Sequence, residues 1–132
     1  MNNIRIVPAR SEDVPIILNL IRALGEYERM TNEVVATEEG LRAWLFGERP
    51  AAEVVLAYAG ETVVGFALFF HNFSTFLGRP GLYLEDLFVI PEWRGRGIGR
   101  RLIVHLAEIA IRRGCGRMEW AVLDWNESAI GF

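Results

Sequence analysis

Glycine and arginine are concentrated in one short segment of the chain. Of the eight residues from 94 to 101, all but one are of these two types, namely Arg94, Gly95, Arg96, Gly97, Gly99, Arg100 and Arg101. A strand-like apolar run precedes the segment, and a helix-like pattern follows it. The first N–H groups of a helix lack intrahelical partners, the helix dipole favours an anion there, and glycine lets backbone approach a ligand closely. The segment is therefore predicted to bind a pyrophosphate.

Two common phosphate-binding motifs are excluded by their spacing. A Walker-type loop ends in Gly-Lys-Ser/Thr, and this turn contains no lysine. A dinucleotide fingerprint requires Gly-x-Gly-x-x-Gly, but counting from Gly95 puts Arg100 at the third glycine, and counting from Gly97 puts Leu102 there. What remains is an arginine with glycines three and five positions later. An ordinary tight turn with solvated arginines is the weaker interpretation, because glycine and arginine are so dense here.

Two adjacent acids, Glu85 and Asp86, interrupt the apolar strand that leads into this turn. Successive side chains of a regular strand point to opposite faces of the sheet. We therefore expect the two carboxylates to lie on opposite faces, where they do not share a proton. A strand-end acid can act as a base or take part in a salt bridge, and both roles are open for Glu85 at this point.

The segments on either side of the turn must position these residues. Residues 82–90 are predicted to form a strand, which Pro91 stops. Apolar residues then recur at three- to four-residue spacing, at Ile98, Leu102, Leu106 and Ile109. They predict a helix that ends at the glycines 114 and 116. Residues 117–123 are a further strand, and because a helix connects it to the first, the two are expected to lie parallel.

The N-terminal half supplies the remaining elements. A strand over residues 4–7 is followed by a helix that Ser11 can cap and that ends near Gly25, and Thr37 can cap a second helix. Two apolar runs, 54–59 and 62–70, meet at Gly60-Glu61 and predict an antiparallel hairpin, after which 72–81 is predicted to be a loop. The predicted order is β-α-α-β-β-β-α-β, a mixed α/β fold.

Length and composition limit the class of protein. With 132 residues, the chain is expected to form one domain, residues 1–132. The net charge of −3 argues against general nucleic-acid binding, because the arginine cluster is local. No apolar run is long enough for a membrane span, the N-terminus lacks the plan of a signal peptide, and Cys115 is the single cysteine. These features predict a cytoplasmic protein without a disulfide.

The sequence also bears on metal binding and on association with other protein chains. His71 and His105 are far apart and lack the spacing of metal ligands, so no metal site is expected. The hydrophobic content of 52% is rich for a free-standing domain and predicts a substantial interface or a missing partner element.

The turn closely resembles the acyl-CoA-binding signature of the GCN5-related N-acetyltransferase (GNAT) superfamily, Arg/Gln-x-x-Gly-x-Gly/Ala. Within that superfamily the chain resembles the diamine (spermidine/spermine) acetyltransferase branch and its thialysine-acetylating relatives. The similarity is carried by the runs Tyr83-Leu-Glu-Asp-Leu-Phe-Val89, Pro91-Glu-x-Arg-Gly95, Gly97-Ile-Gly99, Gly114-Cys115 and Asp124-Trp-Asn126. It is dense over residues 82–132 and thinner before them, where Tyr27, Glu28, Met30 and the predicted hairpin carry it.

The resemblance implies a GNAT-like mixed sheet in which the strands 82–90 and 117–123 splay apart, with the pantetheine arm of acetyl-CoA in the gap. It implies cofactor contacts from the residues Leu87, Phe88, Val89, Arg94, Gly95, Arg96, Gly97, Ile98, Gly99, Arg100 and Asn126. For Asn126 a turn-forming role is the alternative. The last strands of the fold, and the tyrosine proposed as the family's general acid, would follow Phe132, so we expect the sequence to be shortened at its C-terminus.

Acetyl transfer to an amine requires the neutral amine, but with a pKa of about 10.4 only about one alkyl ammonium in 10³ is neutral at pH 7. By the resemblance, Glu85 lies beside the thioester and is the candidate catalytic base. Tyr27, Glu28, Glu85 and Asp86 are the candidate substrate-binding residues. A solvated loop is the alternative for Tyr27 and Glu28, and a loop cap is the alternative for Asp86.

The expected function is therefore N-acetylation of a small primary amine by direct attack on acetyl-CoA, without a metal. Polyamine-acetylating members carry an aspartate where this chain has Ser74, so a lysine-like ω-amine is an alternative to a diamine or polyamine. A non-catalytic acyl-CoA sensor or subunit is the alternative from another class. By the same resemblance a homodimer is expected.

Overall fold

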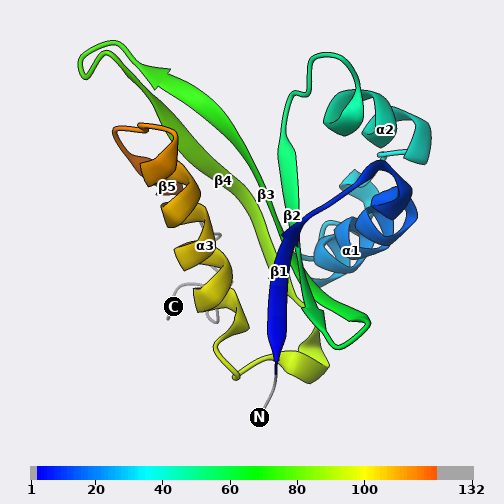
Figure 1. Cartoon of the computed structure of the whole chain (residues 1–132). Helices are drawn as coiled ribbons and strands as arrows, with labels where there is room; N and C mark the ends of the chain where they lie inside the picture. Colours follow the sequence, from blue (N-terminus) through cyan, green and yellow to red (C-terminus); the bar gives the residue numbers. More distant parts are fainter. Residues whose placement is uncertain (1–2, 122–132) are drawn as a thin grey trace.

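The computed structural model describes residues 3–121 as a sheet with helices on both of its faces (Figure 1). The strands are β1 (Ile4–Pro8), β2 (Glu53–Ala59), β3 (Thr62–Ser74), β4 (Arg79–Val89) and β5 (Met118–Trp120). The α-helices are α1 (Val14–Tyr27), α2 (Glu38–Phe46) and α3 (Ile98–Arg112). Short 3₁₀ turns are η1 (Ser11–Asp13), η2 (Thr31–Glu33) and η3 (Pro91–Trp93). The predicted order of strands and helices is confirmed.

The strands form one sheet in the order β1-β2-β3-β4-β5. Neighbouring strands are antiparallel, except that β4 and β5 are parallel, as the helical connection between them predicted. The parallel pairing joins Leu82 to Met118 and Leu84 to Trp120, and within the described residues it goes no further. Beyond Leu84, the β5-side edge of β4 is therefore not covered by described strand.

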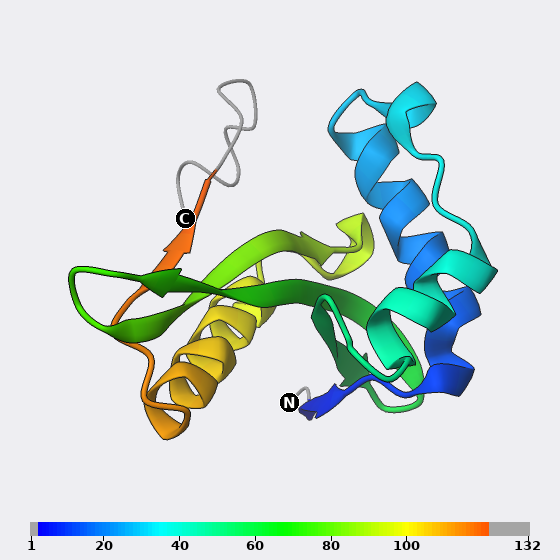
Figure 2. The ribbon, with the colours of Figure 1, turned by 90° about the horizontal axis from the view of Figure 1, so that it is seen from above.

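The two faces of the sheet carry separate cores. Helix α3 packs on one face, and α1 and α2 pack on the other (Figures 1 and 2). All four apolar positions that predicted the helix after the turn are buried against the sheet, at Ile98, Leu102, Leu106 and Ile109. On the opposite face, Ile17 and Leu24 of α1 pack against Phe66 and Phe88 of the sheet. Helical spacing in the sequence thus located the buried face of α3.

A β-bulge interrupts β4 at Glu85. Leu84 pairs with Phe69 of β3 and Asp86 pairs with Leu68, so Glu85 is an extra residue without a partner in the register. Before the bulge Leu84 belongs to the core under α3, whereas after it Phe88 belongs to the core under α1 and α2. The bulge therefore turns the even-numbered side chains of β4 from one face of the sheet to the other.

Three predicted boundaries were wrong. Ser11 does not cap α1, because it lies within η1 and Asp13 is the N-cap of the helix. Helix α1 does not end near Gly25 but continues to Tyr27, because Arg29 adopts a left-handed backbone conformation with φ of 60° and closes the helix there. Residues 72–81 are not a loop throughout, because β3 and β4 remain paired as far as Ser74 and Arg79. The Ser74 side-chain oxygen accepts a hydrogen bond from the backbone N–H of Leu77 at 3.1 Å and stabilises this turn.

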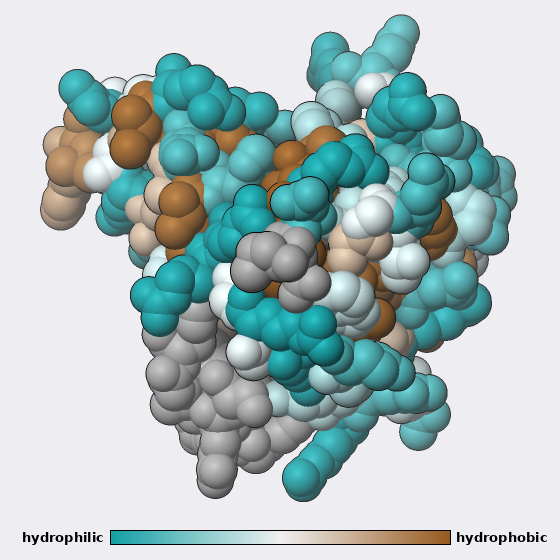
Figure 3. Space-filling model, turned by 60° about the horizontal axis from the view of Figure 1, so that its bottom comes forward, coloured by the Kyte–Doolittle hydropathy of each residue, from teal (hydrophilic) through white to brown (hydrophobic). Residues whose placement is uncertain are grey.

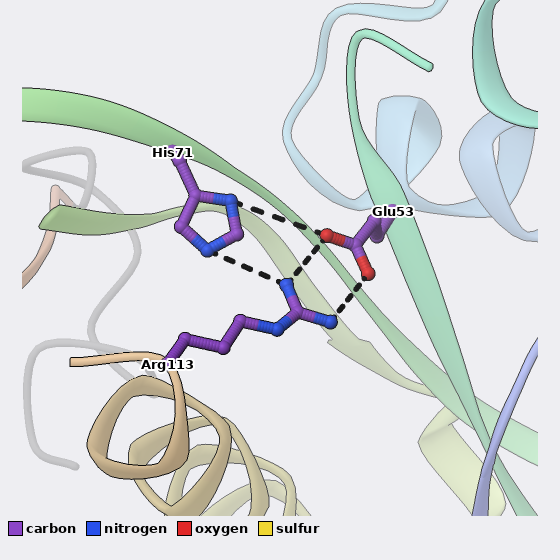
Figure 4. A network of polar contacts seen from close by, with 3 residues as sticks. All are labelled: Glu53, His71 and Arg113. Atoms are coloured by element: carbon purple, nitrogen blue, oxygen red, sulfur yellow. Dashed lines mark hydrogen bonds and ion pairs between the residues drawn. The ribbon is translucent and has the colours of Figure 1, made fainter. Parts of the chain in front are cut away.

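A polar cluster ties the end of α3 to the sheet (Figure 4). Both terminal nitrogens of Arg113 donate to the carboxylate of Glu53, at 2.7 and 3.0 Å, and the Nε2 atom of His71 lies 3.4 Å from one of them. This hydrogen bond raises the pKa of Arg113. The side chains of Arg113 and Glu53 are each about 40% exposed. Their ion pair therefore contributes on the order of 1 kcal/mol or less to the stability of the fold.

Candidate active site

The glycine-rich turn connects β4 and η3 to the start of α3 and leaves open space in front of its backbone. Gly95 and Gly97 have φ of 77° and 80°, a left-handed conformation that favours glycine. A Cβ atom built on either residue would meet no atom within 4 Å. A side chain at these positions would occupy that space. The turn therefore has the form of a cradle in which a ligand can approach the main chain.

The N-terminus of α3 carries positive charge on top of its own dipole. Gly97 is the N-cap and has no side chain to accept from the first N–H groups of the helix. The first turn contains no acidic residue and does contain Arg100 and Arg101. Cations are unfavourable at this end of a helix because they repel its dipole. A bound phosphate would relieve this repulsion, so the turn fits the charged end of coenzyme A.

A pocket of about 410 Å³ extends from this turn along the uncovered edge of β4. Its described lining residues are Tyr27, Glu28, Leu84, Glu85, Asp86, Leu87, Phe88, Val89, Trp93, Arg94, Gly95, Gly97, Ile98, Gly99, Arg100, Ile103, Trp120 and Ala121. One end of the pocket is the cradle, and its wall includes Trp120 at the end of β5 and Ala121 after it. An elongated ligand with a charged end can therefore lie between the parallel strands, as expected from the family resemblance.

Three carboxylates lie together in this pocket. Glu28 comes from the end of α1, and Glu85 and Asp86 come from the bulge of β4. Burial, together with the negative charges of Glu85 and Glu28, raises the pKa of Asp86 to about 6. Burial also raises the pKa of Glu28, with a second contribution from Glu85. The cluster is a concentrated negative site, which suits a cationic amine.

The prediction that Glu85 and Asp86 are separated on opposite faces was wrong. It assumed a regular strand, but the bulge at Glu85 breaks the alternation. Both acids line one pocket, and their charges interact. Glu85 is exposed and Asp86 is partly buried, so they differ in environment despite being adjacent.

The arginines of the turn are engaged in different ways. Arg94 donates from Nε to the carbonyl oxygen of Val89 at 2.7 Å, and its guanidinium lies over the ring of Tyr27. Arg96 stacks on Trp93 at 4.3 Å and does not line the pocket, although it was predicted to bind the cofactor. Arg101 reaches the carbonyl oxygen of Ile4 at 3.0 Å. Arg94 lines the pocket, and so does Arg100, which lies in the first turn of α3.

The structure brings together most of the predicted site residues. The pocket is lined by the predicted residues of β4, by the glycines of the turn, and by Tyr27 and Glu28, which lie far away in sequence. Asn126 lies outside the described residues. Trp93, Ile103 and Trp120 also line the pocket but were not predicted as site residues, because apolar side chains carry no chemical signature in sequence. Ser74 does not line this pocket.

Within residues 3–121, no group of three or more His, Cys, Asp or Glu side chains is arranged to hold a metal ion. Among the helices of the same residues, none combines the length and the apolar character that crossing a membrane requires.

The arrangement can support acyl transfer to an amine. A carboxylate beside a bound amine can accept its proton, and a pKa near 6 suits a group that takes up and releases protons close to neutrality. The cradle can hold the phosphate end of a thioester donor, so donor and acceptor would meet in one pocket along β4. Holding both reactants in this way replaces a collision between free molecules.

Comparison with known proteins supports this interpretation. Residues 18–132 match the profile of the Acetyltransferase (GNAT) family. The chain is 42% identical over 138 residues to a thialysine N-epsilon-acetyltransferase of Mus musculus, covering 98% of this chain and 81% of that protein. It is 33% identical to an L-ornithine N5-acetyltransferase of Arabidopsis thaliana, covering 97% of this chain and 76% of the relative.

A solved structure shares the fold. The structure of an aminoglycoside acetyltransferase from an uncultured soil sample aligns with a TM-score of 0.84 at 22% identity, covering 98% of this chain and 84% of that chain. The mixed sheet, the cradle at the start of α3 and the match over residues 18–132 agree with one another. The chain belongs to the GNAT family of N-acetyltransferases, enzymes that take their acetyl group from acetyl-CoA.

Proposed function

We propose that the protein acetylates the terminal amine of a lysine-like amino acid, with acetyl-CoA as the donor. The observation that carries this proposal is that three carboxylates, Glu28, Glu85 and Asp86, line the same pocket as the cradle at Gly97. The names of the relatives support the substrate class, since they include thialysine and ornithine acetyltransferases. A diamine or polyamine is the second candidate, supported by the 32% identity to a human spermidine/spermine N(1)-acetyltransferase-like protein.

In this proposal Glu85 accepts a proton from the bound ammonium, directly or through a water molecule. The neutral amine then attacks the thioester carbonyl carbon, and the carbon–sulfur bond breaks. Coenzyme A leaves as its thiolate and takes up the remaining proton that the new amide nitrogen must lose. Glu28 and Asp86 attract the cationic substrate. Asp86 is also a proton acceptor in reach of neutral pH, because its pKa is raised to about 6.

The donor is proposed to bind along β4 and the turn. Main-chain groups of Gly95, Gly97 and Gly99 hold its phosphates together with the start of α3, and Arg100 adds charge. Leu87 and Val89 present backbone to the acyl arm along the uncovered edge of β4. Arg94 contributes to donor binding indirectly, because it stands at the beginning of the turn and its side chain donates to the carbonyl oxygen of Val89.

A homodimer in the cytoplasm is proposed as the working state of the enzyme. Hydrophilic side chains cover most of the face in Figure 3, with smaller hydrophobic patches between them. Large apolar side chains are exposed at the β3–β4 turn, where Phe76 is 100% and Phe73 is 61% exposed. Such side chains are more typical of an interface than of a solvated surface.

The test is thiol release from acetyl-CoA with thialysine, ornithine and spermidine in parallel. We expect turnover with thialysine or ornithine to exceed turnover with spermidine. Binding of acetyl-CoA without turnover on any amine would instead support a non-catalytic acyl-CoA sensor. Preference for spermidine would support the polyamine alternative.

The role of Glu85 is tested by Glu85→Gln. We expect kcat/KM to fall about 10²-fold at pH 7, the lower range for loss of a general base, with the loss shrinking as the pH rises and more amine is neutral. Glu92→Gln is the matched control, because Glu92 lies in η3 and does not line the pocket. A loss that does not depend on pH would show that Glu85 is not the base.

A further inference from the structure

The side chain of Arg94 contacts Val89, Tyr27 and Phe88. Its Nε atom donates to the carbonyl oxygen of Val89 at 2.7 Å, which ties the start of the turn to the end of β4. Its guanidinium carbon lies 4.2 Å from the ring centroid of Tyr27 and 5.2 Å from that of Phe88. Arg94 is partly buried, so these contacts are partly shielded from solvent.

Tyr27 is held from two directions by this arrangement. The guanidinium covers its ring, and the ring of Phe88 meets it edge to face at a centroid distance of 6.3 Å. A guanidinium over an aromatic ring contributes more as it is withdrawn from water, and Arg94 is partly buried. Tyr27 is the last residue of α1 and is followed directly by Glu28, one of the three carboxylates of the pocket.

The bulge in β4 makes this contact possible. In a regular strand Phe88, four residues after Leu84, would face α3 as Leu84 does. With the bulge, Phe88 lies under α1 and supports both Tyr27 and Arg94. The same displacement brings Asp86 near Glu28, whose charge raises the pKa of Asp86. The guanidinium of Arg94 thus belongs structurally to the face that carries the acidic cluster.

We propose that Arg94 is a positioning residue for the amine substrate, which holds Tyr27 and thereby Glu28 at the end of α1, rather than a phosphate ligand. The identity of the amine rests on the function proposed above, but the contact itself does not. The geometry requires an arginine: its planar group stacks on Tyr27 while its Nε–H donates to Val89, and a lysine ammonium offers neither the plane nor the fixed donor.

The experiment measures the two ligands separately by calorimetry. Acetyl-CoA is titrated into the protein, and thialysine is titrated into the protein saturated with CoA. The variants are Arg94→Lys, Arg94→Gln, Tyr27→Leu and the double variant Arg94→Gln/Tyr27→Leu, each first checked for an unchanged cooperative thermal transition. Because neither titration requires turnover, a loss of catalysis does not affect the result.

We expect both Arg94 variants to weaken thialysine binding about tenfold, the scale of one partly buried cation–π contact with its hydrogen bond. We expect acetyl-CoA binding to change less than threefold. The double variant should bind thialysine no more weakly than Tyr27→Leu alone, because Arg94 acts through Tyr27. A tenfold loss of acetyl-CoA affinity in Arg94→Gln that Arg94→Lys restores would identify a phosphate ligand and overturn the proposal, as would unchanged thialysine binding.

Hydrogen exchange of the Arg94 Nε–H is a third measurement, and it tests the role of Arg94 independently of the proposed substrate class. If the CoA-loaded wild-type protein does not bind thialysine, the substrate assignment fails, and the role of Arg94 is then decided by the acetyl-CoA titration and by hydrogen exchange of its Nε–H in the free protein. Slow exchange in the wild type that becomes fast in Tyr27→Leu supports the proposal. Exchange that does not respond to Tyr27→Leu overturns it.

Discussion

At the scale of single residues, the two neighbouring acids of β4 have different environments. Glu85 is the extra residue of the bulge and is exposed, whereas Asp86 is partly buried beside two other carboxylates. Burial and like charges both disfavour the ionised form of Asp86. An acid in such a place costs stability when it is charged. Such a cost is typical of a group that serves a site rather than the fold.

The unfavourable burial of the Asp86 carboxylate predicts how the folding stability depends on pH. Its pKa is raised from 3.8 to about 6 in the folded protein, so the folded state binds this proton more tightly than the unfolded state. The stability that the protonated group contributes is present below about pH 4 and is lost as the pH rises through about 6. Asp86→Asn should therefore be more stable than the wild type at pH 7.5, by on the order of 1–3 kcal/mol.

This difference is measured by urea unfolding of both proteins across the pH range. It should shrink as the pH falls from 7.5 toward about 4, because the wild-type carboxyl becomes neutral over that range. A difference that stays constant with pH, or a variant less stable than the wild type at pH 7.5, would contradict the buried, raised-pKa state of Asp86.

At the scale of elements, the end of α1 presents Tyr27 and Glu28 to the pocket. The backbone N–H of Met30 donates to the carbonyl oxygen of Gly25 at 2.7 Å, and that of Arg29 donates to the carbonyl oxygen of Glu26 at 3.1 Å. This pair of bonds closes a helix around a left-handed residue, which is usually glycine. Here the residue is Arg29, with φ of 60°.

The cap predicts a difference between two substitutions. Arg29→Gly and Arg29→Ala both remove the side chain, but only glycine adopts a positive φ without strain. Arg29→Gly should be about 1 kcal/mol more stable than Arg29→Ala, the cost of a left-handed conformation for a residue with Cβ. Thermal unfolding of the two variants measures this difference. Equal stability would show that the end of α1 is not held in the left-handed conformation.

Periodic features of the elements were predictable from sequence, and local irregularities were not. The buried stripe of α3, the cap in which Thr37 accepts from the N–H of Gly40 at 3.0 Å, and the hairpin at Gly60 follow from spacing and residue type. The bulge at Glu85 does not, because an inserted residue leaves the same residue types in the strand. The faces of the acids could therefore not be assigned in advance.

The site shows the same division. Glycines and arginines located the cradle, because few other roles require them at such density. The contact of Arg94 with Tyr27 depends on residues 67 positions apart and on the bulge that moves Phe88, so no local pattern reveals it. The strand pairing of 72–74 was hidden by the glycines and proline that follow it, which also serve a tight turn between paired strands.

At the scale of the whole molecule, the two ends of α3 have different roles: one borders the pocket, and the other is bound to the sheet. Its N-terminus faces the cradle and the pocket along β4, and its C-terminal end is fixed to the sheet by the pairing of Arg113 with Glu53 (Figure 4). The helix rests on one core, and the second core places α1 on the opposite face of the sheet (Figure 2). Both faces contribute to the pocket, because it opens at the uncovered edge of β4.

The glycines beyond the two ends of α3 provide a matched comparison for the central claim. Gly97 and Gly114 both have positive φ, at 80° and 74°, and a Cβ on either would meet no atom within 4 Å. Replacing either with tryptophan imposes a similar backbone strain at opposite ends of one helix. Only Gly97 lines the pocket.

The most direct measurement is the dissociation constant of acetyl-CoA for the wild type, Gly97→Trp and Gly114→Trp, determined by calorimetry on folded protein. The bulky side chain at 97 should fill the phosphate cradle, so we expect binding to become too weak to detect in Gly97→Trp and to stay within about threefold of the wild type in Gly114→Trp, a change of under about 1 kcal/mol. Wild-type affinity in a folded Gly97→Trp protein would contradict the assignment of this turn as the acetyl-CoA site.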